Sequence, residues 1–179
     1  MPFYTGLGDN GKSGTMDESG IDKSSDIFEA EGDIDELNSY IGLAAYYVED
    51  ERVRNMLKRV QNELFSIGAL LATKERSKLK VNEFGNEHTK MLEQEIERMS
   101  KALPEPKEFV IPGGCEGAVH LQVARALARR AERRVIKLAK TQEVESGIKS
   151  YLNRLSTYFY VAALYLNKSE GIEEEHPEY

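Results

Sequence analysis

Apolar residues recur every three or four positions in five separate segments of this 179-residue chain, and this spacing constrains the fold more than any other feature. Such a period places apolar side chains on one face of an α-helix. The clearest stripe predicts a helix at about 50–73 and consists of Val53, Leu57, Val60, Leu64, Ile67 and Leu71. The same period predicts four further helices: one at about 33–48, one marked by Leu92, Ile96, Met99 and Leu103 and stopped by Pro104, one at about 116–140, and one at about 148–167.

Five amphipathic helices with short connections predict an all-α fold, a five-helix up-and-down bundle with a glycine-rich N-terminal loop. We expect a single domain overall, made of the glycine-rich N-terminal loop at 1–25, the bundle at 26–168 and an acidic C-terminal tail at 169–179. Runs of acidic residues are usually hydrated, so we expect the tail to be solvated and mobile.

Two connections between the helices have a distinctive composition. The stretch from Thr73 to about Gly85 is polar, rich in lysine and without a period, and it predicts an exposed loop. Phe109-Val110-Ile111 precedes a Pro-Gly-Gly turn. An apolar triplet that ends in such a turn predicts a short buried connector.

The composition argues against several classes of protein. A net charge of −7 makes the chain a poor candidate for nucleic-acid binding, because phosphate contacts need a broad basic field. No apolar run approaches the roughly 20 residues that span a bilayer. The N-terminus has neither the basic flank nor the apolar core of a secretion signal. The single cysteine, Cys115, agrees with a reducing compartment. We therefore expect a cytoplasmic protein that binds neither nucleic acid nor membrane.

Positive charge is concentrated on the predicted fourth helix. Residues 125–140 contain seven basic side chains and one acid, within a chain of net charge −7. At about 100° per residue, one polar stripe is formed by Arg125, Arg129, Glu132 and Arg133. The residues expected to face the core are Val119, Val123, Leu127, Ala131 and Leu138. A compact group of arginines on an acidic protein indicates a compact anion, since the guanidinium group binds phosphate oxygens through two hydrogen bonds at once.

The stripe also contains one acid, Glu132, which is a candidate ligand for Mg²⁺ beside the phosphates. Mg²⁺ prefers one or two carboxylates together with phosphate oxygens. The alternative is a solvated helix face whose arginines pair with surface acids. Arg130 and Arg134 lie further round the helix, and we predict a structural role for them.

The N-terminal segment 5–14 has the composition of a phosphate-binding loop. Its glycines allow backbone N–H groups to approach phosphate, and Lys12 adds positive charge. Residues 6–13 satisfy the spelling G-x-x-x-x-G-K-S, but no apolar strand precedes them and no helical period follows Gly14. The segment is therefore not a Walker A loop, which requires a strand-to-helix turn. A flexible terminal arm is the alternative interpretation.

Other polar residues have structural explanations. Asp33, Asp35 and Glu36 begin the first helix, where acids complement the helix dipole, and a functional role would require one of them to face an arginine of the fourth helix. His120 is expected to be a packed histidine. Cys115 is expected to be a small buried residue, because no adjacent base is evident. The Glu-x-x-His spelling of di-iron bundles occurs only in the tail, which disfavours that function.

The motifs together resemble those of the PduO-type ATP:cob(I)alamin adenosyltransferases over nearly the whole chain. They occur in the family's order and with similar spacing. The blocks are Tyr4-Thr5, Gly8-Asp9, Gly11 and Ser13; Asp33-Ile34-Asp35-Glu36-Leu37-Asn38-Ser39; Gln61-Asn62-Glu63-Leu64-Phe65 with Leu71-Ala72-Thr73; Phe109-Val110-Ile111-Pro112-Gly113-Gly114; Ala124-Arg125 with Arg129-Arg130-Ala131-Glu132-Arg133; and Leu152-Asn153-Arg154-Leu155-Ser156.

The resemblance implies a homotrimer of five-helix bundles, with each active site between two subunits. It implies that the N-terminal loop folds around the triphosphate of ATP. The residues implied there are Thr5, Gly6, Gly8, Asp9, Gly11, Lys12, Ser13 and Lys23. Arg129 and Arg133 would contact ATP, Glu132 would help to hold Mg²⁺, and Asn153 would contact the nucleotide.

The remaining implied residues act at the subunit interface and at the corrin. Asp35 and Arg125 would pair across the interface. Phe109 would lie near the corrin and help to exclude a lower axial ligand from cobalt, which makes Co(II) easier to reduce.

The family often has lysine where this chain has Asn10, and Lys12 is the candidate replacement. Lys23 is the candidate for the basic residue that follows the loop. The family usually has aspartate where this chain has Thr157.

The implied reaction transfers the 5′-deoxyadenosyl group of ATP to Co(I) of cobalamin and forms adenosylcobalamin. Cobalt is the nucleophile and the whole triphosphate leaves, which fits a sequence without a catalytic dyad. ATP and cobalamin would be the substrates, and a cobalamin reductase and an adenosylcobalamin-dependent enzyme are candidate partners. Two other classes stay open: a non-catalytic nucleotide-binding bundle, and an interaction module whose basic helix docks an acidic partner.

Overall fold

The computed structural model describes residues 3–4, 6–73, 84–105 and 107–178. Within them the chain forms a short antiparallel hairpin followed by five helices. The elements are β1 (Lys12–Gly14), β2 (Ser19–Asp22), α1 (Asp26–Tyr47), α2 (Glu51–Ala72), α3 (Asn86–Ser100), α4 (Glu116–Leu138) and α5 (Ser146–Ser169). The predicted all-α five-helix bundle is confirmed. Most of the loop expected at 73–85 lies outside the described residues.

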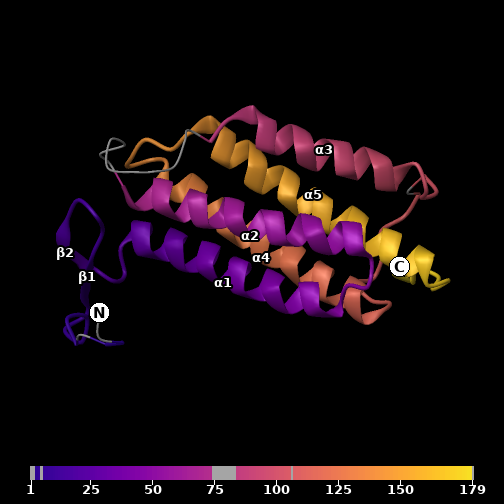
Figure 1. The fold of residues 1–179 in the computed structure, drawn as a ribbon, viewed down its shortest axis with the longest axis horizontal. Helices are drawn as coiled ribbons and strands as arrows, with labels where there is room; N and C mark the ends of the chain where they lie inside the picture. The colour runs from indigo at the N-terminus through magenta and orange to yellow at the C-terminus, as the bar shows by residue number, and fades with distance from the viewer. Residues whose placement is uncertain (1–2, 5, 74–83, 106, 179) are drawn as a thin grey trace.

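The helices lie side by side along the long axis of the molecule (Figure 1). α1 packs against α2 and α4, while α5 packs against α3 and α4. The hairpin lies at one end of the bundle, beyond the start of α1, whereas the C-terminus and the connection from α3 to α4 lie at the opposite end (Figure 1). None of the helices in the described part of the chain has the length and apolar character needed to cross a bilayer.

The first helix starts earlier than its apolar period predicted. α1 begins at Asp26 and not at residue 33. Its first turns bury Ala30 and half-bury the nearby Ile27 and Phe28, but these three residues do not make a repeating stripe, so the period is too weak there to mark a helix. The start of α2 is set by a capping interaction, because the carboxylate of Asp50 accepts the N–H of Val53 over 2.8 Å.

The bundle core contains the predicted α2 stripe and the largest buried side chains of α5. Every residue of the α2 stripe between Val53 and Leu71 is buried. Among the largest fully buried side chains of the described chain are Tyr151, Tyr158 and Phe159, all on α5. Fully burying a side chain such as Phe contributes roughly 1.5–3 kcal/mol relative to leaving it in water. α5 therefore contributes strongly to the stability of the bundle.

The inward face of α4 differs from the predicted one. Val119 and Val123 are 42% and 40% exposed, and Leu127 is only partly buried, so for these residues the prediction was wrong. Ala131 and Leu138 are buried as expected. The face that meets the core is Ala118, Leu121, Gln122, Ala124, Ala128, Ala131, Val135 and Leu138. The prediction followed the large aliphatic residues, whereas α4 packs between two helices and buries mainly small side chains that let the backbones approach closely.

The connector and the tail also differ from expectation. Phe109 and Ile111 are 79% and 41% exposed, so the predicted buried connector is wrong. Most of the tail is exposed, as predicted, but it is not free, because the N–H of Ile111 donates to the carbonyl of Glu175 over 2.8 Å. The connector crosses the end of the bundle, where the tail and not the core lies along its backbone.

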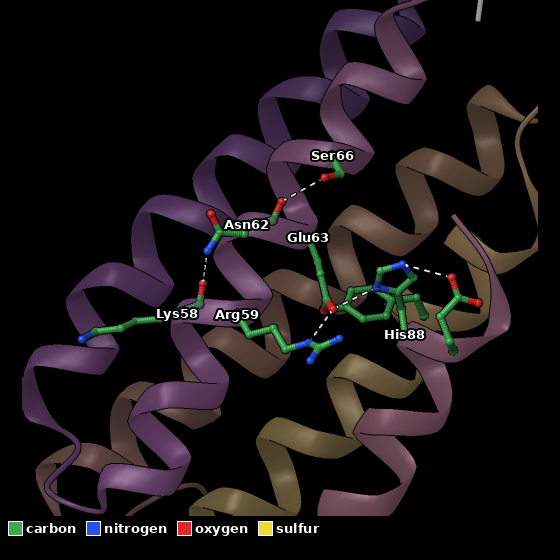
Figure 2. Close-up of polar contacts among 8 residues, drawn as sticks. Lys58, Arg59, Asn62, Glu63, Ser66 and His88 are labelled. Carbon is green, nitrogen blue, oxygen red and sulfur yellow. Dashed lines mark hydrogen bonds and ion pairs between the residues drawn. The ribbon is translucent and has the colours of Figure 1, made fainter. Parts of the chain in front are cut away.

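A buried carboxylate connects α2 to α3 and α5 (Figure 2). Glu63 accepts hydrogen bonds from Tyr151 Oη over 2.6 Å and from Arg59 Nε over 2.9 Å. His88 Nδ1 lies 2.9 Å from the same carboxylate. Burial raises the pKa of Tyr151 well above its ordinary value, and the Glu63 charge adds to this effect, so the phenol keeps its proton and stays a donor. Asn62, by contrast, donates to the backbone of its own helix.

This network predicts that Tyr151→Phe lowers the free energy of unfolding by about 1–3 kcal/mol, because a buried carboxylate oxygen loses its donor. Denaturant unfolding followed by circular dichroism measures the loss. Tyr158→Phe is the matched control, since Tyr158 is equally buried on α5 and its hydroxyl makes no hydrogen bond to the residues that the structure describes. Equal losses in the two variants would contradict the role assigned to the network.

Candidate functional site

Acidic side chains of α1 neutralise one side of the arginine-rich helix α4. Arg130 pairs with Glu36, and the other pairs are Arg130 Nε–Asp33 Oδ1 at 3.3 Å, Arg134 Nη2–Glu29 Oε2 at 2.9 Å and Lys137 Nζ–Asp26 Oδ1 at 2.7 Å. The predicted structural role of Arg130 and Arg134 is thus confirmed. The acids at the start of α1 thus form ion pairs with α4, in addition to complementing the dipole of their own helix.

Arg129 and Arg133 lie about 60–140° round the helix from the paired arginines. Both side chains are exposed, and neither has an acidic partner among the residues that the structure describes. The same helix therefore carries neutralised and unneutralised arginines on neighbouring faces. Because an unpaired guanidinium group retains its charge and its five donors, Arg129 and Arg133 remain available to an anion.

The contact between Glu132 and Asn153 brings together two residues singled out in the sequence. Asn153, exposed on α5, donates from Nδ2 to Glu132 Oε1 over 2.9 Å. Glu132 lies one turn from Arg129 on α4 and next to Arg133. The bond orients the carboxylate beside the two unpaired arginines. These four residues form one surface, which we call the arginine surface.

The arginine surface fits a magnesium ion only if the nucleotide supplies most of the ligands. Within the described residues, no group of three or more His, Cys, Asp or Glu side chains is arranged to hold a metal ion. Mg²⁺ in nucleotide sites commonly takes one or two carboxylates and fills its remaining positions with phosphate oxygens and water. Glu132, with one oxygen held by Asn153, has the chemistry for that single protein contact.

A single chain does not bring Asp35 and Arg125 together. Asp35 is exposed at a groove of about 360 Å³ between α1 and α2, which is also lined by Asn38 and Phe65. Arg125 on α4 is half-buried and donates from Nε to Gln122 Oε1 over 2.8 Å. In the part of the chain that the structure describes, no hydrogen bond or ion pair joins Asp35 to Arg125.

The N-terminal arm forms turns that depend on glycine. Gly6 and Gly11 have φ of +68° and +79°, in the left-handed region that favours glycine. Lys23 folds back over the loop: its N–H donates to the carbonyl of Gly11 over 2.9 Å, and a Cβ on Gly8 would lie 2.7 Å from its Nζ. The strand β1 follows the loop, so the exclusion of a Walker A loop is confirmed. Thr5 lies outside the described residues.

The predicted ATP loop and the arginine surface stay apart within one chain. Asp9 and Lys12 are exposed and Ser13 is half-buried, all in the arm beyond the end of the bundle (Figure 1). No hydrogen bond or ion pair among the described residues connects the arm to Arg129. Phe109 lies in the connection at the opposite end of the molecule (Figure 1). The predicted site residues therefore fall into separate groups.

Two other candidates are structural, as the sequence predicted. The ring of His120 stacks on Tyr47 with 4.4 Å between centroids, and its Nδ1 lies 2.9 Å from Tyr40 Oη. Cys115 is buried, and burial raises the pKa of its thiol. A raised pKa disfavours the thiolate that a nucleophile needs.

The residues that hold the Phe109 connector gave no signal of this role in the sequence. Asn167, 2% exposed near the end of α5, and His176 in the tail both contact the connector. These contacts join positions 52 and 67 residues apart. Asn167 belongs to no charged cluster, and the Glu-x-x-His spelling of the tail drew attention to His176 only as a metal-binding pattern. Their contacts with the connector are therefore revealed only by the folded chain.

Comparison with known proteins identifies the class. The chain is 41% identical over 177 residues to a corrinoid adenosyltransferase of Bacillus subtilis (strain 168), covering 96% of this chain and 90% of that protein. It is 36% identical over 179 residues to the corrinoid adenosyltransferase MMAB of Mus musculus, covering 97% and 76%. The helical bundle and these relatives together identify the chain as an adenosyltransferase.

The family model described as cobalamin adenosyltransferase matches residues 3–166. The fold is similar to that of a variant PduO-type ATP:corrinoid adenosyltransferase from Lactobacillus reuteri complexed with cobalamin and ATP, with a TM-score of 0.92, 29% identity and coverage of 99% of this chain and 100% of that chain. The chain belongs to the cobalamin adenosyltransferase family.

The two kinds of arginine on α4 should respond differently to substitution. We expect Arg130→Ala to lower the free energy of unfolding by about 0.5–1 kcal/mol, because it leaves acids of α1 without their partner. Arg129→Ala should change it by less than about 0.5 kcal/mol, as for other surface positions. Chemical denaturation of both variants at low ionic strength measures the difference. A larger loss for Arg129→Ala than for Arg130→Ala would overturn the division of the helix.

Proposed function

We propose that this chain transfers the 5′-deoxyadenosyl group of ATP to Co(I) of cobalamin and releases triphosphate. The observation that carries the proposal is the arginine surface, where two unpaired arginines lie beside a carboxylate oriented by an amide. This combination of charges suits a triphosphate with Mg²⁺. The relative from Bacillus subtilis is named a corrinoid adenosyltransferase, and the Lactobacillus reuteri structure contains cobalamin and ATP.

The reaction needs no nucleophile from the protein. The electron pair of Co(I) attacks the 5′ carbon of ATP, the bond from that carbon to the triphosphate oxygen breaks, and triphosphate leaves with the electron pair. The task of the protein is to orient ATP and to neutralise the leaving group. Buried Cys115 and packed His120 agree with this division of labour.

The arm and the arginine surface supply the contacts to ATP. Arg129 and Arg133 neutralise the phosphates, Glu132 helps to hold Mg²⁺, and Asn153 contacts the nucleotide. The arm encloses the triphosphate through Thr5, Gly6, Gly8, Asp9, Gly11, Lys12, Ser13 and Lys23. The left-handed glycines and the lysine folded over the loop support this role, because glycine lets the backbone turn tightly around a ligand and the lysine adds positive charge beside it.

We infer that the protein works as a homotrimer, with each site shared by two subunits and with Asp35 paired to Arg125 of its neighbour. The groove beside Asp35 supports this assembly. Phe65 there is 70% exposed, and the buried Oδ1 of Asn38 has no hydrogen-bond partner among the described residues. A buried polar atom without a partner costs roughly 1–3 kcal/mol, so the groove is a surface that association would complete.

Phe109 is the residue that we assign to the corrin. Its ring is 79% exposed on a connector fixed by hydrogen bonds, which suits an apolar contact with a large flat ligand. Exclusion of a lower axial ligand from cobalt would make Co(II) easier to reduce. A cobalamin reductase and an adenosylcobalamin-dependent enzyme are the proposed partners, and the cytoplasm is the proposed compartment.

The visible spectrum of chemically reduced cobalamin tests the function. Mixed with protein, ATP and Mg²⁺ under strong reduction, Co(I) cobalamin should convert to adenosylcobalamin, with one triphosphate formed per cobalt–carbon bond. The same mixture without ATP is the control. Binding of ATP without formation of the cobalt–carbon bond would reject the transferase in favour of a non-catalytic nucleotide-binding bundle.

Arg129→Ala should reduce kcat by about 10²-fold, the usual loss when one donor to a developing negative charge is removed. Arg134→Ala is the matched control, since it removes the same group from the side of α4 that pairs with α1. Initial rates of adenosylcobalamin formation at saturating ATP measure both. Unchanged turnover in Arg129→Ala would refute the phosphate role of this residue.

The proposed pair across subunits predicts charge reversal and rescue. Asp35→Arg and Arg125→Asp should each weaken assembly and lower the adenosylation rate, whereas the double variant should recover both. Light scattering gives the mass in solution, and the spectral assay gives the rate. Because the two residues do not touch within one chain, recovery in the double variant is diagnostic of a contact between chains. A double variant no better than the worse single variant would show that the pair does not form.

A further inference from the structure

Asn167 joins three segments at the C-terminal end of the bundle. Its Oδ1 accepts the N–H of Cys115 over 2.9 Å, and its Nδ2 lies 3.1 Å from both the Gly113 carbonyl and Glu174 Oε1. Its own carbonyl accepts the N–H of Ile172 over 2.9 Å. The residue is 2% exposed. One buried amide thus fastens the start of α4, the Pro-Gly-Gly turn and the tail to the end of α5.

The turn is shaped to fit this amide. Gly114 has φ of +109°, which side chains rarely adopt, and a Cβ there would lie 2.0 Å from Asn167 Oδ1. The backbone of the turn therefore packs directly on the Asn167 side chain. Because no other residue fits at 114 without displacing the amide, the path of the connector into α4 depends on Asn167.

The tail fixes the other end of the connector. His176 Nδ1 lies 2.9 Å from the carbonyl oxygen of Phe109, with Glu108 Oε2 at 3.9 Å from the same nitrogen. A carbonyl oxygen only accepts, so Nδ1 carries the proton and donates it. Two residues further on, the N–H of Ile111 donates to the carbonyl of Glu175 over 2.8 Å. The backbone is held on both sides of residue 110.

The side chain of Phe109 is left in solvent by this arrangement. Its backbone is fixed, yet its ring is 79% exposed. Exposure of a large apolar side chain on an ordered backbone is typical of a surface that binds a ligand. Asn167 and the tail also lie beyond the residues matched by the family model, so their contacts are read from this chain alone.

We propose that Asn167 and His176 are positioning residues, which hold the connector so that Phe109 stands against the corrin ring. The inference rests on the proposed function and deepens it. Because the connector is already ordered, binding of the corrin does not lose free energy to ordering it. Loosening the connector should therefore weaken cobalamin binding and the exclusion of the lower ligand, while ATP contacts in the arm and on the arginine surface are unaffected.

The test uses the full-length protein with cobalamin and ATP varied separately. His176→Ala should raise KM for cobalamin about five-fold, as expected for the loss of one hydrogen bond, with KM for ATP changed less than about two-fold. His176→Asn keeps a donor near the position of Nδ1 and should recover most of the loss. Glu173→Gln is the matched control, an exposed change in the same tail at a residue without a hydrogen bond or ion pair in the described part of the chain.

Two spectroscopic measurements report on the connector itself. Electron paramagnetic resonance of Co(II) cobalamin with protein and ATP should show a smaller fraction of cobalt without its lower ligand in His176→Ala than in the wild type. Hydrogen exchange should be faster at the Ile111 amide. Asn167→Asp, which keeps the acceptor but loses both donors, should show larger changes of the same kind. His176 lies on the surface, so its variants still test the positioning role if the Asn167→Asp variant does not fold.

One set of outcomes rejects the positioning role of Asn167 and His176, and a different outcome rejects the proposed adenosyl transfer. An active wild type whose His176→Ala variant keeps the same KM for cobalamin and the same resonance spectrum overturns the positioning role. Equal increases in both KM values also overturn it, because they indicate a general loss of structure. A wild type that forms no adenosylcobalamin rejects the proposed function, and the corrin role of the connector with it.

Discussion

The close packing of α4 between α1 and α5 is the constraint on which the rest of the structure depends. Ala124, Ala128 and Ala131 are fully buried along this contact, and their size sets the distance between the helices. A larger side chain there would push α4 outward. The bond from Asn153 to Glu132 would then be broken, and the ion pairs to α1 would be stretched. The charged surface is thus a product of core packing.

Ion pairing divides the arginines of α4 between two tasks. Those facing α1 pair with its acids, whereas Arg129 and Arg133 keep their charge and are the residues that we propose for the ligand. This division matters in a protein of net charge −7, which as a whole repels a nucleotide anion. A local positive surface overcomes that repulsion only where its own acids do not neutralise it. One helix can therefore stabilise the bundle through one set of arginines and leave another set charged, which is what the proposed phosphate site needs.

The sequence predicted the features that arise from local periodicity. The α2 stripe is buried throughout, and the spacing of Arg129, Glu132 and Arg133 correctly placed them on one surface. The inward face of α4 was mispredicted, since alanines give little hydrophobic signal although they are the buried residues. The exposed connector and its support by Asn167 could not be predicted, because contacts over 52 or more residues leave no local pattern. The role of Phe109 came from family resemblance alone.

The fit of Gly114 against Asn167 makes the two positions a single unit for protein engineering. A library that varies residue 114 alone samples only side chains that collide with a buried amide. One that varies residue 167 alone leaves the turn without the group around which it is folded. Efforts to redesign this end of the bundle therefore have to change both positions together, or leave both fixed and alter the tail.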